Sequence, residues 1–150
     1  MKKIISILLL LIVSSCGYTT VYKNDKSNDL VLIINEMTGN KEINNLIKNQ
    51  LELYSVKNSE NKFYINFNSD FIKTIISKNS NGTTSDYELY LKAEFKIKHN
   101  EKKDTFSFQE RFNIKNISNS FEQKNYENNV KNNFSSSIRK KLILKLLNMK

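Results

Sequence analysis

The segment YELYLKAEFKIK, residues 87–98, decides the fold of this chain because every second residue along it is apolar. Charged residues occupy the positions between, and only Tyr90 interrupts them. Side chains alternate between the two faces of a strand, so this period of two predicts one buried and one solvated face. The side chains expected on the buried face are Tyr87, Leu89, Leu91, Ala93, Phe95 and Ile97.

A polar turn at residues 100–104 follows, and the alternation resumes through residues 106–114. Two alternating runs joined by a polar turn predict an antiparallel hairpin. Glu110 falls on the apolar side of the second strand, which indicates either a bulge or a contact with a partner group. His99, just before the turn, is predicted to be a surface residue.

Upstream, residues 30–34 form a near-continuous apolar run, which predicts a strand buried on both faces. Asn40 is a predicted N-cap for a helix whose apolar residues recur at helical spacing, with Asn44 on its polar face. Residues 63–67 alternate as in a strand, residues 71–76 fit a strand or a helical turn, and residues 78–85 are predicted to be a loop.

The last third of the chain has helical spacing. Ser120 and Gln123 fit a capping box, and apolar residues then step by four at Tyr126, Val130, Phe134, Ile138 and Leu142. This helix either packs on the sheet or lies on a membrane as a basic amphipathic helix, and its Asn- and Ser-rich polar face favours packing.

The element order is therefore β-α-β-β-β-α. Neither helix can bury its apolar stripe alone, and the hairpin offers one apolar face. We expect an α+β fold in which two helices pack on one face of a four-stranded mixed sheet. The crossover through the first helix predicts that the first two strands are parallel.

The N-terminus has the layout of a secretory signal: two lysines, an apolar run over residues 4–13, and two serines before Cys16. The apolar run is too short for a transmembrane helix, which needs about 20 residues. A cysteine at the cleavage point is typical of a bacterial lipoprotein signal, so we expect residues 1–15 to be removed and Cys16 to be acylated. Residues 16–28 would be a lipidated tether and residues 29–150 a single α/β domain, anchored at the periplasmic side of the outer membrane.

Charge and composition narrow the function classes. The net charge of +9 falls to +7 without Lys2 and Lys3, which suits anionic lipids or phosphate-bearing partners, while export argues against nucleic acid. The sequence has one histidine, one cysteine and three glycines, with no phosphate loop, catalytic triad or metal-ligand motif. We expect no enzyme activity, no cofactor and no metal, which makes a small periplasmic hydrolase a remote alternative.

Four segments together resemble the lipopolysaccharide-assembly lipoprotein family, LptE, in its short form: Cys16-Gly17-Tyr18, residues 39–46, residues 85–93, and residues 111–147. The resemblance lies in the order and lengths of the elements, and the sequence lacks the Pro that some members carry after the lipidated start. It implies a plug in the lumen of a large outer-membrane β-barrel, LptD-like, that aids assembly of the barrel and transport of lipopolysaccharide.

Basic residues would then contact lipopolysaccharide, and the candidates at loop ends are Lys73, Lys78, Lys102 and Lys103. Lys92, Lys96 and Lys98 on the solvated strand face are suited to a polar barrel interior or to phosphorylated sugars. The alternative function is an outer-membrane lipoprotein that binds another periplasmic partner, such as an activator of an envelope synthase.

Overall fold

Four strands and two helices build the part of the chain that the computed structural model describes, residues 29–56 and 59–149. The elements are β1 (Val31–Gly39), α2 (Lys41–Glu52), β2 (Lys62–Lys78), β3 (Thr84–His99), β4 (Lys102–Lys115) and α3 (Ser120–Leu147). The signal peptide, the tether and the lipidation of Cys16 fall outside the described residues.

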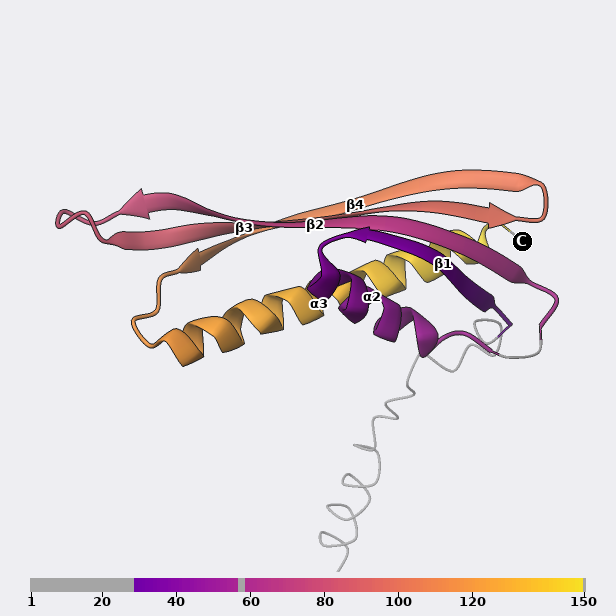
Figure 1. The fold of residues 1–150 in the computed structure, drawn as a ribbon, viewed down its shortest axis with the longest axis horizontal. Coiled ribbons are helices and arrows are strands. Elements are labelled where there is room, and N and C mark those ends of the chain that lie inside the picture. The colour runs from indigo at the N-terminus through magenta and orange to yellow at the C-terminus, as the bar shows by residue number, and fades with distance from the viewer. Residues whose placement is uncertain (1–28, 57–58, 150) are drawn as a thin grey trace, which may run out of the picture.

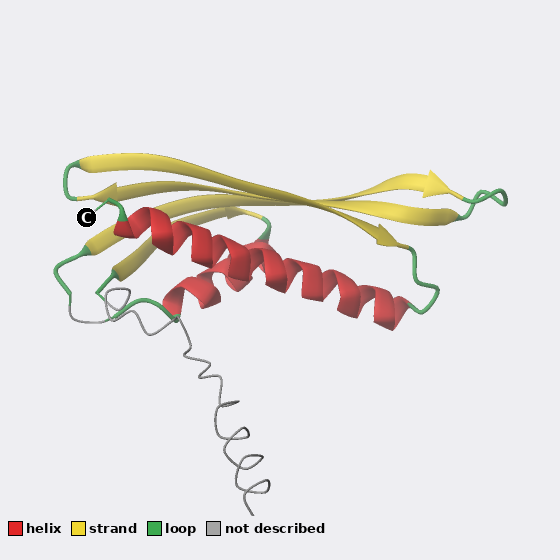
Figure 2. Cartoon of the chain, turned by 180° about the vertical axis from the view of Figure 1, so that it is seen from behind, coloured by secondary structure: helices red, strands yellow, loops and turns green. Residues whose placement is uncertain are grey.

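The sheet has the order β1-β2-β3-β4, with β1 parallel to β2 and the other pairs antiparallel. Both helices lie along one face of it, and the other face is open (Figure 1 and Figure 2). The predicted α+β class, the element order and the parallel first pair are confirmed.

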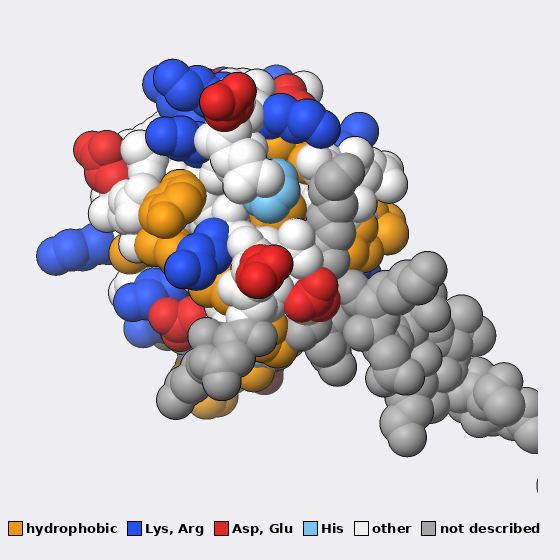
Figure 3. Space-filling view, turned by 90° about the vertical axis from the view of Figure 1, so that its right-hand side faces the viewer, with side chains coloured by type: hydrophobic (Ala, Val, Ile, Leu, Met, Phe, Trp, Pro, Cys, Tyr) orange, Lys and Arg blue, Asp and Glu red, His pale blue; other side chains and the backbone are white. Residues whose placement is uncertain are grey.

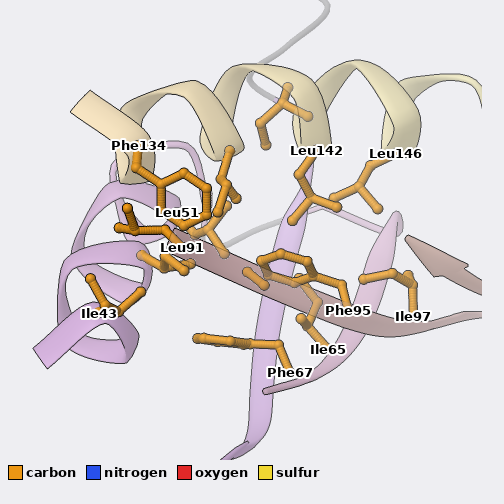
Figure 4. Close-up of a cluster of buried hydrophobic side chains, with 14 of the residues drawn as sticks. Ile43, Leu51, Ile65, Phe67, Leu91, Phe95, Ile97, Phe134, Leu142 and Leu146 are labelled. Carbon is orange, nitrogen blue, oxygen red and sulfur yellow. The ribbon is translucent and has the colours of Figure 1, made fainter. Parts of the chain in front are cut away.

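The core lies between the sheet and the two helices. The alternating side chains of β3 from Leu89 to Ile97 are at most 2% exposed, as the sequence predicted. Figure 4 shows them meeting apolar side chains of α2 and α3, with Phe95 near Leu142. Burial of such side chains contributes about 25 cal/mol per Å² of apolar area, so this layer supplies most of the stabilisation.

β1 corrects the prediction of a strand buried on both faces. It is an edge strand with only half-buried residues from Val31 to Ile34, and it is exposed from Asn35 onward. A strand is buried on both faces only where both faces of the sheet are covered, and here one face is open.

β1 ends at Gly39, which has a φ of +87°. A Cβ at this position would lie 2.1 Å from the Ser69 carbonyl oxygen, so only glycine fits the close approach. Asn40 then caps α2 as predicted, accepting a hydrogen bond from the Ile43 N–H at 3.0 Å. Asn44, predicted on the polar face, is instead buried between the Ser69 hydroxyl at 2.7 Å and the Thr38 carbonyl at 2.9 Å.

β2 and β3 are long. Residues 71–76 belong to β2, which settles the choice between strand and helical turn, and the predicted loop is shorter than expected because β3 starts at Thr84. The paired residues 70–92 form an arm that reaches beyond the end of β1 (Figure 1), which we call the distal arm.

The structure also places two polar side chains whose positions the sequence left uncertain or predicted wrongly. His99 is not a surface residue: it is 5% exposed and its ring stacks on Phe63 with centroids 4.2 Å apart. Glu110 does not mark a bulge, because it pairs with Leu91 in an unbroken β3–β4 register. Its carboxylate accepts hydrogen bonds from Ser137 at 2.8 Å and Lys141 at 2.9 Å on α3.

The predicted capping box of α3 is displaced by one residue. Asn119 is the N-cap and accepts from the Phe121 N–H, while the Gln123 side chain accepts from the Ile117 N–H at 2.8 Å. Tyr126, predicted in the apolar stripe, is 45% exposed because the sheet lies farther from this end of the helix (Figure 2). The stripe from Val130 to Leu142 is buried as predicted.

Candidate ligand-binding face of the sheet

The open face of the sheet carries a basic hollow near the β3–β4 turn. Register places Tyr64 of β2 beside Lys98 of β3, and Lys98 beside Lys103 of β4. The next row across the same strands is Asn66, Lys96 and Thr105. These two rows and their neighbours line a shallow depression of about 630 Å³, which we call the basic hollow.

Three ammonium groups in the hollow are exposed and have no carboxylate partner. Lys96, Lys98 and Lys103 make no ion pair with any other residue in the described part of the chain. Lys92, farther along β3, is different because its Nζ lies 3.5 Å from Glu94. Among the described residues, Asp104 is the one carboxylate that lines the hollow, so the net charge of the hollow is positive.

This arrangement favours a ligand that carries both anionic and sugar-like groups. An ammonium donates charge-assisted hydrogen bonds to phosphate or carboxylate oxygens. The Tyr64 side chain is 40% exposed and offers an apolar ring with a hydroxyl, while the Asn35 and Asn66 amides add donors and acceptors. Basic side chains also gather at this end of the molecule along the top and left in Figure 3.

The four predicted ligand-binding lysines do not come together. Lys73 and Lys78 lie in the distal arm, whereas Lys102 and Lys103 begin β4 at the opposite end of the sheet. Lys73 is inside β2 rather than at a loop end, and its Nζ donates to Glu127 at 2.6 Å over the Tyr87 ring. Burial raises the pKa of the Glu127 carboxyl, but hydrogen bonds from Lys73 and Gln123 outweigh this and hold the pKa below its ordinary value.

Lys78 is exposed at the end of β2. The Lys102 Nζ lies 3.5 Å from the Met149 carbonyl oxygen, beyond the end of α3. Only Lys103 joins the basic hollow, where it meets two lysines that the sequence placed on the solvated face. The signal for this pairing was present, because a tight turn after His99 aligns Lys98 with Lys103.

Some other kinds of site are absent from the described residues. No group of three His, Cys, Asp or Glu side chains gathers there to hold a metal ion. Neither α2 nor α3 combines the length and apolar character needed to cross a membrane.

With this geometry in place, the chain can be compared with known proteins. No protein-family model matches the sequence, and no curated protein matches it significantly. Solved structures do match. A candidate lipoprotein from Caulobacter crescentus has a TM-score of 0.58 at 6% identity, covering 83% of this chain and 92% of that chain.

Lipoprotein B from Nitrosomonas europaea, a protein described as uncharacterized, has a TM-score of 0.52 at 11% identity, covering 78% of this chain and 83% of that chain. The fold is shared with proteins described as lipoproteins. At such identities the likeness establishes the fold alone, and the side chains of the basic hollow are a property of this chain.

Proposed function

We propose that this protein is an outer-membrane lipoprotein that assists assembly of the lipopolysaccharide-export β-barrel, plugs it, and contributes to lipopolysaccharide transport. The observation that carries the proposal is the open, polar and basic face of the sheet. A plug in a water-filled barrel must present polar surface to the lumen. Three lysines that make no ion pair within residues 29–56 and 59–149 suit the phosphate groups of lipopolysaccharide.

The lipoprotein signal supports the same function from an independent part of the chain. Acylation of Cys16 would hold the domain at the membrane in which the barrel resides. Two or three acyl chains anchor a protein stably, whereas one chain binds only marginally. The resemblance to the LptE family and the shared fold agree with this assignment.

The lipid-binding step is tested by removing the charges of the basic hollow in the full-length protein. Combining Lys96→Gln, Lys98→Gln and Lys103→Gln should lower affinity for lipopolysaccharide at least tenfold, since each lost charge-assisted bond weakens binding. The matched control is Lys41→Gln with Lys124→Gln and Lys140→Gln, which removes the same charge from exposed helix positions. Equal loss in both triple variants would show a nonspecific charge effect and reject the hollow as the binding site.

The anchor is tested separately. Cys16→Ala should release the protein from the outer membrane, and fractionation of cells with detection of the tagged protein measures this. In cells depleted of the barrel, which would itself hold the domain, unchanged membrane association would refute lipidation while leaving the basic hollow as it stands.

A further inference from the structure

The last two turns of α3 carry an exposed leucine among basic side chains. Leu142 and Leu146 are fully buried in the core, and Leu144 lies two residues from each, so it points away from the sheet and is 64% exposed. Lys140 and Lys141, one turn earlier, are its neighbours on the helix surface. An apolar side chain therefore stands at the centre of a basic patch on the outer side of the helix layer.

The patch has a positive net charge. Its four cations are Arg139, Lys140, Lys141 and Lys145. In the described part of the chain, Glu110 of β4 is the one carboxylate that pairs with any of them, 2.9 Å from the Lys141 Nζ, which leaves a net charge of +3. Basic side chains near the end of a helix complement its dipole. The dipole does not account for the exposed leucine between them.

The end of α2 lies beside this patch and carries a second exposed leucine. The Arg139 guanidinium donates to the Gln50 amide oxygen at 2.7 Å and lies 5.1 Å from the centre of the Tyr54 ring. Leu53, next to Tyr54, is 73% exposed, so it and Leu144 are the most exposed of the large aliphatic side chains that the structure describes. Both helices end at the same end of the molecule (Figure 2). We call the two leucines and the four cations the docking surface.

The docking surface lies near the point where the lipidated tether would enter the domain. The Val56 N–H donates to the Leu30 carbonyl at 2.9 Å, and Val56 follows Leu53 by three residues, which is at most about 11 Å of chain. Residues 17–28 link the domain to Cys16 and can span at most about 40 Å. Acylation of Cys16 would therefore keep a bilayer surface within reach of the docking surface.

We propose that the docking surface rests on the anionic phospholipid surface of the bilayer in which Cys16 is anchored. Leu53 and Leu144 enter the boundary between headgroups and acyl chains, and the cations around them bond to lipid phosphates. Anionic lipids attract basic side chains only within about a Debye length, and the short tether brings the domain to that distance. Docking through the helix layer turns the open face of the sheet, with its basic hollow, away from the bilayer.

This inference rests on the lipidated anchor of the proposed function, but not on the barrel or on lipopolysaccharide. The docking surface belongs to the helix layer, whereas the basic hollow lies on the opposite face of the sheet. Loss of Lys140 therefore leaves the hollow unchanged. The test uses the purified full-length protein in vesicles without barrel or lipopolysaccharide, and the mass of the intact protein reports acylation separately. An unacylated Cys16 would overturn the anchor and docking together, whereas failure of docking alone leaves the anchor and the hollow standing.

The experiment places a single fluorescent label on the acylated protein in phosphatidylethanolamine vesicles that contain phosphatidylglycerol. Acylation occupies the thiol of Cys16, the one cysteine of the chain, so Leu144→Cys supplies one reactive thiol. A quencher carried on lipid headgroups should lower the fluorescence of this label at least threefold. Ser107→Cys is the matched control, because Ser107 is exposed on the open face of β4 and its label shares the same tether. Its fluorescence should change little.

The contribution of charge is tested with the same label. Each lysine near an anionic membrane strengthens binding by about fivefold. Lys140→Gln with Lys145→Gln should therefore lower the ratio of docked to undocked protein at least tenfold, and vesicles of phosphatidylcholine alone should have a similar effect. Lys41→Gln with Lys124→Gln removes the same charge from exposed positions at the starts of the two helices and should leave the ratio unchanged.

The proposal is overturned if the label at position 144 is quenched no more than the label at position 107. It is also overturned if quenching persists unchanged in neutral vesicles or without Lys140 and Lys145. Quenching only after lipopolysaccharide is added would assign the surface to that lipid, and a disulfide-linked dimer of Leu144→Cys before labelling would assign it to a second copy. The substituted side chains are exposed or half-buried, so the variants should fold, and thermal unfolding curves matching the wild type verify this.

Discussion

The two halves of β2 differ in what covers them. From Phe63 to Phe67, alternate side chains are fully packed under α2 and α3, and β1 lies alongside. In the distal arm, three isoleucines are about half exposed, and the arm is tied to α3 by the Lys73–Glu127 pair. One strand thus passes from a region with fully buried side chains into a region where Phe71 is only partly buried against the core and the following isoleucines are half exposed.

This difference separates the region that stabilises the fold from the region whose groups are available for an interaction. Apolar burial is the dominant stabilising term of a fold, whereas ion pairs at a surface contribute about 0–1 kcal/mol. The proximal half is therefore where substitutions should unfold the protein. The distal arm has backbone and apolar surface left for an interaction, and the basic hollow offers charge on the open face.

The largest effect is expected in the proximal core. Phe95 is fully buried and stacks on Phe67 with ring centroids 5.0 Å apart. Phe95→Ala should lower the free energy of unfolding by about 3–5 kcal/mol, the usual cost of such a cavity. Chemical denaturation measures it, with Tyr126→Ala on the exposed end of α3 expected to cost about 0.5 kcal/mol or less. Similar losses for both variants would break the distinction between the two regions.

A smaller effect on stability is expected at Gly39, where β1 ends and the distal half of β2 begins. Gly39→Ala forces a Cβ against the Ser69 carbonyl and strains a φ of +87°, so it should cost about 1–3 kcal/mol. Gly82→Ala is the matched control, because this glycine also has a positive φ of +77° but nothing lies within 4 Å of its added Cβ. If the two variants lose the same stability, the close approach at the end of β1 contributes nothing beyond backbone strain.

The smallest effect is expected in the distal arm, and it depends on pH. The pKa of Glu127 is below its ordinary value of 4.5, so its contribution is complete above pH 4.5 and is lost as the pH falls through the folded pKa. Glu127→Gln should therefore cost about 0.2–1 kcal/mol at neutral pH and nothing in acid. Denaturation curves from pH 3 to 7 measure this, with Glu101→Gln in the β3–β4 turn as the control.

A difference between wild type and Glu127→Gln that is constant with pH would show that the carboxylate does not hold the arm through its charge.

The comparison also explains how far the sequence could predict the structure. The strict alternation through residues 87–98 gave the buried face of β3, because a core covers that whole side. The same period of two extends to His99 and marks it as buried, but the contact with Phe63 on the neighbouring strand depends on strand pairing. Residues 71–76 could not be assigned because neither face of the distal arm is fully covered, and apolar residues therefore occur on both.

The candidate site was predicted only in part. Alternation placed Lys96 and Lys98 on the solvated face, but the lysines near predicted loops spread to opposite ends of the sheet. Lys73 makes an ion pair with a helix residue 54 positions away, a contact that no local pattern contains.

The measurement that tests the central claim most directly is a gentle detergent pull-down of the tagged full-length protein from its own outer membrane, with protein and lipid both identified. The account predicts a large β-barrel in stoichiometric amount together with lipopolysaccharide. Recovery of a soluble periplasmic enzyme instead, or of no barrel, would contradict the plug function and favour a lipoprotein that serves a different periplasmic partner.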